Sequence, residues 1–149
     1  MADNPDLQGL AGLIERQRAR GLESCADAGV LLDKAAAAAD LVALLTDDPA
    51  RSPESWDMAV ILPELLRDFP GRLTAVALLP DAAREVARRF GVGRLPSLLF
   101  LRGGHYVGVL EGVYDWAMLA PAVERLLATP PSRPPGIGIP VTASPTSCR

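Results

Sequence analysis

Thiol and imidazole side chains are the groups in this 149-residue sequence that could act as nucleophiles, metal ligands or general bases near neutral pH. The sequence contains two cysteines, Cys25 and Cys148, and a single histidine, His105. The cysteines lie far apart and form no Cys-x-x-Cys pair, which excludes a disulfide framework and a four-cysteine metal site. One histidine beside Gly104 in a turn is expected to be exposed and not catalytic. No metal and no cofactor are therefore expected.

Carboxylates gather in the segment 46–58, where they stand beside one basic residue, Arg51. Carboxylates next to an indole ring suit a partner that presents paired arginines and apolar side chains. The alternative is a solvated loop in which Asp57 only favours a helix N-terminus. Met58 could offer a soft apolar contact to a partner or could pack in the core. The residues of interest in this segment are Asp47, Asp48, Glu54, Trp56, Asp57 and Met58.

The hydrophobic pattern predicts the elements that position these residues. Helical spacing of apolar residues predicts helices over 7–20, 30–39, 59–69, 82–90 and 116–127. Continuous apolar runs predict strands over 41–45, 73–79, 97–101 and 106–110, the last two joined by a Gly-Gly turn. This order predicts an α/β fold with a mixed central sheet of about four strands and helices on both faces.

Residues at the predicted helix ends add local detail. Asp81 is expected to be the N-cap of the helix 82–90, and Gly91 is expected to end it. Asp115 is expected to cap the last helix, whose first residue, Trp116, is expected to face the sheet.

The composition is that of a soluble globular protein, with 49% hydrophobic and 22% charged residues. No apolar run approaches the ~20 residues that a membrane span requires, and the acidic start lacks the layout of a secretory signal. A cytoplasmic location without membrane insertion is therefore expected. The net charge of −3 argues against nucleic acid as the main partner.

The last 21 residues differ from the rest of the chain. Segment 129–149 holds six of the fourteen prolines and no carboxylate. So few apolar groups cannot offset the entropy of ordering, which predicts a folded domain over 1–128 and a disordered Pro-rich tail over 129–149. Two arginines lie in that tail, so the predicted domain carries a net charge of −5.

A proline stands directly before the third predicted strand, in the run Leu95-Pro96-Ser97, and Pro63 lies inside the predicted helix 59–69. Both positions resemble those of the thioredoxin-like family, in which a proline, usually cis, opens the strand before the last hairpin. The resemblance implies a cis peptide bond at Pro96, against the commoner trans form of X–Pro bonds.

The same resemblance shows what the sequence lacks. Counting back from Pro63 places the run Ser55-Trp56-Asp57-Met58 where that family carries Cys-x-x-Cys. Dithiol exchange needs an attacking thiolate and a resolving thiol, and neither outer position of this run supplies one. The two cysteines lie before the first predicted strand and in the tail, so neither replaces the missing pair. The sequence therefore predicts the scaffold of an oxidoreductase without its chemistry.

Longer motifs narrow the resemblance. They are Asp48-Pro49-x-Arg51-x-Pro53-Glu54, Glu64-Leu65-Leu66-Arg67-Asp68-Phe69-Pro70, Arg89-Phe90-Gly91-Val92-x-Arg94-x-Pro96 and Gly104-x-Tyr106-x-Gly108-Val109-Leu110-x-Gly112. Over residues 7–128 this combined run resembles the HyaE/HupG type of hydrogenase-expression protein.

The second resemblance implies a cytoplasmic, non-enzymatic assembly chaperone in NiFe-hydrogenase maturation. Its expected partner is the precursor of the hydrogenase small subunit, bound through its twin-arginine signal peptide before export. Other hydrogenase accessory proteins are further candidate partners. The residues predicted to bind the partner are Asp47, Asp48, Glu54, Trp56, Asp57, Met58, Leu95 and Pro96.

Two other classes of function stay open. One is a thiol-disulfide oxidoreductase that acts through mixed disulfides of Cys25, and the other is a general peptide-binding module of thioredoxin shape. A separate group of arginines, Arg88, Arg89 and Arg94, flanks the proline loop. These arginines could bind an acidic surface, or the helix C-terminus at Gly91 could account for them, since helix C-termini favour cations.

Overall fold

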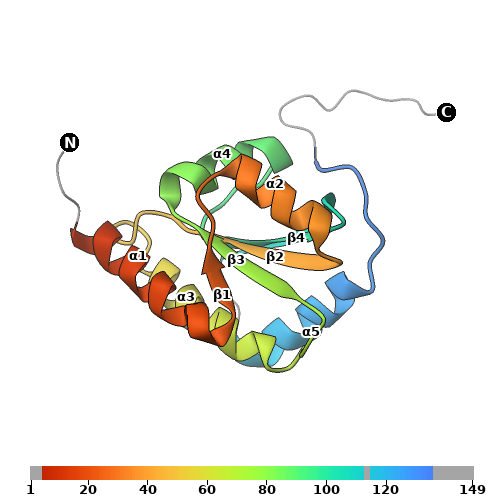
Figure 1. Ribbon diagram of the computed structural model, residues 1–149, viewed down its shortest axis with the longest axis horizontal. Helices are drawn as coiled ribbons and strands as arrows, with labels where there is room; N and C mark the ends of the chain where they lie inside the picture. Colours follow the sequence, from red (N-terminus) through yellow and green to blue (C-terminus); the bar gives the residue numbers. More distant parts are fainter. Residues whose placement is uncertain (1–4, 113–114, 136–149) are drawn as a thin grey trace.

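A mixed sheet forms the centre of the computed structural model, which describes residues 5–112 and 115–135 (Figure 1). Within these residues the sheet has five strands in the order β1-β3-β2-β4-β5. Strands β1, β3 and β2 are parallel to one another, while β4 is antiparallel to both of its neighbours, β2 and β5. The strands are β1 (Leu22–Ser24), β2 (Asp40–Leu45), β3 (Thr74–Leu78), β4 (Ser97–Arg102) and β5 (His105–Glu111).

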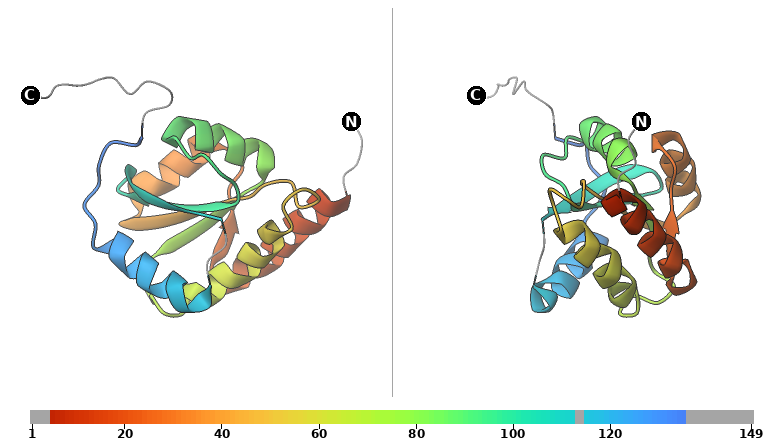
Figure 2. Two further views of the ribbon diagram at one scale, coloured as in Figure 1. Left: turned by 180° about the vertical axis from the view of Figure 1, so that it is seen from behind. Right: turned by 90° about the vertical axis from the view of Figure 1, so that its left-hand side faces the viewer.

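Helices cover both faces of the sheet. Helices α1, α3 and α5 pack on one face, and α2 and α4 pack on the other, which is clearest in the right-hand view of Figure 2. The helices are α1 (Pro5–Arg16), the 3-10 helix η1 (Gln17–Arg20), α2 (Ala28–Ala37), α3 (Glu54–Leu66), α4 (Pro80–Phe90) and α5 (Trp116–Leu127).

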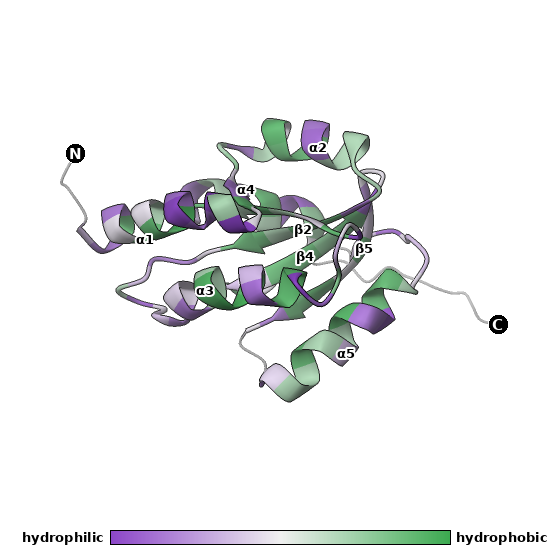
Figure 3. Cartoon of the chain, turned by 60° about the horizontal axis from the view of Figure 1, so that its bottom comes forward, coloured by the Kyte–Doolittle hydropathy of each residue, from purple (hydrophilic) through white to green (hydrophobic). Residues whose placement is uncertain are grey.

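The central strands are apolar on both faces because both faces are covered by helices. In β2, Val42 and Leu44 pack toward the helices α1, α3 and α5, while Leu41, Ala43 and Leu45 pack toward α2 and α4. All five are at most 1% exposed, and the central strands are coloured as hydrophobic in Figure 3. The predicted α/β architecture, a mixed sheet with helices on both faces, is confirmed.

The sheet contains one more strand than the sequence predicted. Strand β1 is three residues long and pairs with β3 at the edge of the sheet, with Leu22 opposite Ala75. Its only buried side chain is that of Leu22, so no hydrophobic run or alternation marks it in the sequence. Pairing with a distant strand, and not local propensity, makes this segment extended.

The ends of α4 and the start of α5 agree with the predictions only in part. Asp81 is not the N-cap of α4, because Leu79 takes that position and Pro80, with its fixed φ, begins the helix. Gly91 ends α4 in the left-handed region at φ 68°, as predicted. Asp115 does precede α5 but forms no capping hydrogen bond with its side chain, and Trp116 is 49% exposed. The first turn of α5 therefore contributes nothing to the core, and burial begins at Leu119.

The first residues of the predicted tail follow the edge of the sheet. The N–H of Ser132 donates to the carbonyl of Tyr106 in β5 at 2.8 Å, and Arg102 donates to the carbonyls of Leu127 and Thr129 at 2.8 Å each. Residues 136–149 lie outside the described residues, so the domain boundary and the disorder of the tail stay predictions. No helix in the described parts of the chain combines the length and apolar character needed to cross a membrane.

Candidate partner-binding site

The peptide bond between Leu95 and Pro96 is cis, as the resemblance to thioredoxin-like domains implied. Pro96 stands directly before β4, where Ser97 lies between Leu45 of β2 and Glu111 of β5. The carbonyl of Pro96 accepts a hydrogen bond from the N–H of Gly112 at 2.9 Å. The N–H and carbonyl of Leu95, in contrast, form no backbone hydrogen bond within the described residues. An extended chain could therefore pair with this exposed stretch of backbone.

The two positions where thioredoxins carry their dithiol are both buried here. Ser55 is 0% exposed, and its Oγ accepts from the N–H of Asp47 at 3.0 Å. Met58 is 2% exposed and packs in the core beneath α3. Met58 is therefore a core residue, and its side chain does not offer the surface contact that was one of its two predicted roles.

Asp47 is committed to its own loop. Its carboxylate accepts from Arg51 Nη2 at 2.9 Å, Ser52 Oγ at 2.7 Å and the Asp48 N–H at 2.8 Å, and only 15% of the side chain is exposed. These hydrogen bonds, that from Arg51 first, lower the pKa of Asp47 to about 2 despite its partial desolvation. A carboxylate so fully bonded has little capacity left for a partner's arginine.

Asp48 also organises the loop. Its Oδ1 accepts from the N–H of Ala50 at 2.9 Å, and its carbonyl accepts from the N–H groups of Arg51 and Ser52 at 3.0 and 2.7 Å. This is the local turn chemistry typical of aspartate. The two carboxylates at the start of the predicted binding segment thus shape the loop that precedes α3.

The remaining residues of the segment lie on or near the surface. Glu54 and Asp57 are exposed, and neither forms an ion pair with another described residue. Trp56 is half-buried, and its indole ring lies against the backbone of α1 at Gly9. Trp56 lies in the first turn of α3, as do the two exposed carboxylates, Glu54 and Asp57.

A cavity of about 280 Å³ brings part of the predicted set together, and we call it the proline groove. Of the predicted residues it contains Glu54, Leu95 and Pro96, whereas Trp56 and Asp57 do not line it. Pro96 is buried, so Leu95 supplies the more accessible apolar surface. The groove is lined by Arg51, Ser52, Glu54, Arg94, Leu95, Pro96 and Gly112.

The charged side chains of the proline groove differ in whether they are free to pair with a ligand. Arg51 is neutralised by Asp47, while Glu54 and Arg94 have no ion-pair partner within the described residues. The Arg94 guanidinium lies over Gly112, where a Cβ would approach its Cζ to 3.4 Å. Gly112 and Ser52 were not predicted as lining residues. Only the tertiary fold brings them to the groove, and their local sequence gives no sign of it.

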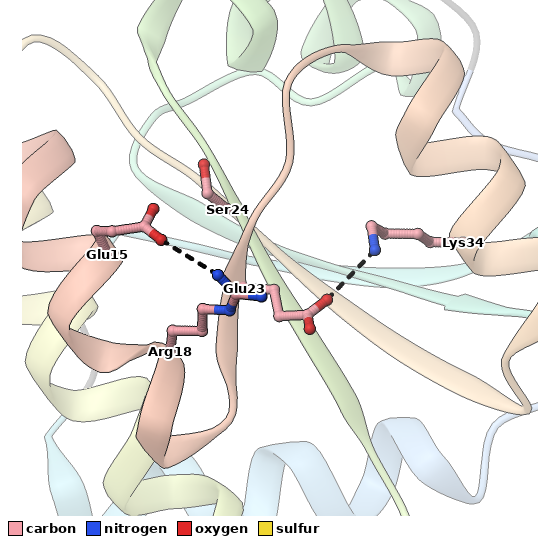
Figure 4. A pocket seen from close by; sticks show the side chains of 5 residues that line it. All are labelled: Glu15, Arg18, Glu23, Ser24 and Lys34. Carbon is pink, nitrogen blue, oxygen red and sulfur yellow. Dashed lines mark hydrogen bonds and ion pairs between the residues drawn. The ribbon is translucent and has the colours of Figure 1, made fainter.

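A second cavity, of about 340 Å³, opens over the edge strand β1 and is shown in Figure 4. Its charged side chains pair with one another, Arg18 with Glu15 at 3.7 Å and Lys34 with Glu23 at 3.2 Å. Because these charges are already compensated, this cavity offers less to a charged ligand than the proline groove does. Ser24 completes its lining.

The surroundings of Cys25 make its thiol unreactive. The residue is 3% exposed, its Sγ lies 3.5 Å from the carbonyl oxygen of Asp27, and burial raises the pKa of the thiol. Cys148 lies outside the described residues. Within residues 5–112 and 115–135, no three His, Cys, Asp or Glu side chains are grouped so that they could hold a metal ion.

The fold and the groove define a thioredoxin-like domain, in which Ser55 and Met58 stand at the positions that counting back from Pro63 assigns to the dithiol. A thioredoxin from Halobacterium salinarum shares this fold, with a TM-score of 0.61 over 75% of this chain and 96% of that one, at 16% sequence identity.

The family model described as "Hydrogenase-1 expression protein HyaE" matches residues 13–119, and the chain belongs to this family. The hydrogenase expression/formation protein HoxO of Cupriavidus necator is 41% identical over 146 residues, which are 97% of this chain and 91% of HoxO. The solved structure of a protein described as hydrogenase expression/formation protein hupG, from Rhodopseudomonas palustris, is 34% identical. It has a TM-score of 0.50 and covers 71% of this chain and 95% of that one. The resemblance noted in the sequence is confirmed.

Proposed function

We propose that this hydrogenase expression protein is a non-enzymatic assembly chaperone in NiFe-hydrogenase maturation. It binds the precursor of the hydrogenase small subunit through its twin-arginine signal peptide, in the cytoplasm, before export. The observation that carries the proposal is the proline groove itself. The groove keeps a free stretch of backbone at Leu95, while Ser55 and Met58 stand where a redox protein needs thiols.

The groove offers a bound peptide both backbone and charge contacts. An extended segment would pair with the N–H and carbonyl of Leu95 and lay an apolar side chain on it. Glu54 lines the groove, and Asp57 is exposed three residues further along α3. Each of these carboxylates can accept a two-point hydrogen bond from an arginine, the geometry that a pair of arginines would exploit. Asp47 and Asp48 support this surface from within the loop.

The environment of Cys25 argues against the alternative function, a thiol-disulfide oxidoreductase. Its burial and its raised pKa both lower the population of reactive thiolate at neutral pH. Insulin reduction by the purified chain is therefore expected to stay at background, and turnover that Cys25→Ser abolishes would favour the oxidoreductase.

Co-purification from cell extract tests the proposal. The tagged small-subunit precursor is expected to capture the chain, and the precursor without its signal peptide to capture much less. Glu54→Gln should weaken capture, whereas Asp33→Asn, an exposed carboxylate on α2 across the sheet, should not. Capture of neither precursor form would contradict the proposal. Equal capture of unrelated twin-arginine precursors would instead indicate a general peptide-binding module.

A further inference from the structure

A third cavity, of about 250 Å³, lies beside the C-terminal half of α4, and we call it the α4 cleft. Its floor is apolar, formed by Ala87, Val92 and Leu95. Its rim is basic, formed by three arginines together with the backbone of Gly93: Arg84, Arg88 and Arg94. Clustered arginines beside an apolar surface suit a short peptide that carries acidic and apolar side chains.

The rim charges are largely uncompensated. Arg88 and Arg94 are exposed and form no ion pair with any described residue, and the neighbouring Arg89 is likewise unpaired. Arg84 is the exception, since it pairs with Asp81 and approaches Asp47 to 4.0 Å. Two cationic groups of the rim, Arg88 and Arg94, therefore face solvent without an ion-pair partner among the described residues. One carboxylate lies at the same rim, that of Glu111, which accepts from the N–H of Gly93 at 3.0 Å.

The helix dipole accounts for only part of this arrangement. Arg88 and Arg89 lie in the last turn of α4, where a cation is favourable. Arg94 lies beyond Gly91, outside the helix, and the dipole explains neither its place nor the apolar floor between it and Arg88. The predicted domain 1–128 has a net charge of −5, so the basic rim is opposite in sign to the net charge of the domain.

We propose that the α4 cleft binds an acidic segment of a partner protein. An apolar side chain of that segment enters the cavity against Ala87 and Leu95, and flanking aspartates or glutamates pair with Arg88 and Arg94. The cleft is distinct from the carboxylate side of the proline groove, although Arg94 and Leu95 line both cavities. The chain thus presents an acidic contact on one side of the cis-proline loop and a basic contact on the other.

Two other occupants would have to be distinguished from a partner protein. One is a second copy of this acidic chain. The other is the chain's own segment 136–149, which follows Pro135 in the sequence. The carbonyl oxygen of Pro135 lies close to Gly91, where a Cβ would approach it to 2.4 Å. That segment has no carboxylate side chain, so charge complementarity favours a partner over it.

A binding titration with two synthetic peptides tests the proposal on the full chain. The probe is a fluorescein-labelled peptide with leucines flanked by aspartates and glutamates, and the matched control replaces each acid by its amide. We expect saturable binding of the acidic peptide that weakens as salt rises. The double variant Arg88→Gln/Arg94→Gln should raise the Kd about tenfold. Arg125→Gln, an exposed and unpaired arginine on α5, should leave the Kd unchanged.

Several results would overturn the proposal. Equal binding of both peptides, no binding of either, or an equal effect of Arg125→Gln would each remove the specific role of the rim. Self-association that the double variant abolishes, with no peptide binding, would make a second copy the occupant. Amide NMR shifts at Val92 and Gly93 that respond to Ile137→Ser/Ile139→Ser, and not to the peptide, would make the chain's own segment the occupant.

Discussion

Ser55 Oγ accepts a hydrogen bond from the backbone N–H of Asp47 at 3.0 Å and donates one to the carbonyl oxygen of the same residue at 3.2 Å. The hydroxyl thereby holds the first turn of α3 to the loop that follows β2. Counting back from Pro63 assigns Ser55 to the position at which thioredoxins carry a cysteine of their dithiol. The residue that replaces a reactive group is therefore a structural one, and it fixes the loop that borders the proline groove.

Ser55→Ala should destabilise the fold, because it leaves the N–H of Asp47 without a partner in a buried setting. We expect a loss of about 1–3 kcal/mol in the free energy of unfolding, measured by urea denaturation. Ser24→Ala is the control, since Ser24 is exposed and its side chain forms no hydrogen bond among the described residues. Equal effects of the two substitutions would contradict the structural role of Ser55.

Asp47 should make stability depend on pH in the acid range. Its pKa is about 2 in the folded chain against 3.8 in the unfolded one, so the ionised form stabilises the fold by about 2 kcal/mol above pH ~4. This stabilisation is lost as the pH falls through about 2, because the folded state then also binds the proton. Asp47→Asn removes it at every pH, so the stability gap between wild type and variant should narrow from pH 7 to pH 2.5. A gap that stays constant or widens would contradict the assignment.

Two glycines of α1 form a matched pair for testing the contact with Trp56. A Cβ on Gly9 would lie 2.7 Å from Cη2 of Trp56, whereas a Cβ on Gly12 would meet nothing closer than Arg16 Nη1 at 3.5 Å. Gly12→Ala should therefore raise stability by up to about 1 kcal/mol through helix propensity. Gly9→Ala should instead lower it by about 1–3 kcal/mol, since the indole must move. Thermal unfolding together with tryptophan fluorescence checks both, and a gain in Gly9→Ala would show that the indole is not held there.

Ser97, directly after the cis proline, is 0% exposed, and its Oγ has no hydrogen-bond partner among the described residues. Burying an unpaired hydroxyl costs free energy that alanine avoids. Ser97→Ala should thus leave stability unchanged or raise it by up to about 1 kcal/mol in the same denaturation assay. A clear loss would mean that the hydroxyl has a partner in solution.

The parts of the fold that follow from local signals were predictable from the sequence. The helix end at Gly91 and the buried strand at 41–45 each depend on a few adjacent residues whose chemistry admits few conformations. The cis bond at Pro96 followed from the family resemblance instead, because local chemistry alone favours the trans form. Strand β1 was not predictable in this way, because only pairing with β3 makes it extended. The exposure of Trp116 was missed for a related reason, since periodicity does not tell which turns of a helix extend past the core.

The sequence indicated which segments form the candidate site, but not which of their side chains face solvent. An acidic composition does not reveal whether a carboxylate bonds to its own loop, as Asp47 and Asp48 do, or faces solvent, as Glu54 does. The place of Arg94 over Gly112 depends on the tertiary fold alone. Glu54 and Leu95, both in the predicted binding set, line the same groove, and their binding role stays a prediction.

Calorimetric titration of the purified chain with the small-subunit precursor tests most directly whether the proline groove, without thiols, is a docking surface. We expect one saturable site for the precursor that carries its signal peptide. Charge reversal by Glu54→Lys should weaken that binding at least about tenfold, while Asp33→Lys on the opposite face of the sheet should leave it unchanged. Absence of binding, or equal affinity of the Glu54→Lys variant and the wild type, would contradict the account.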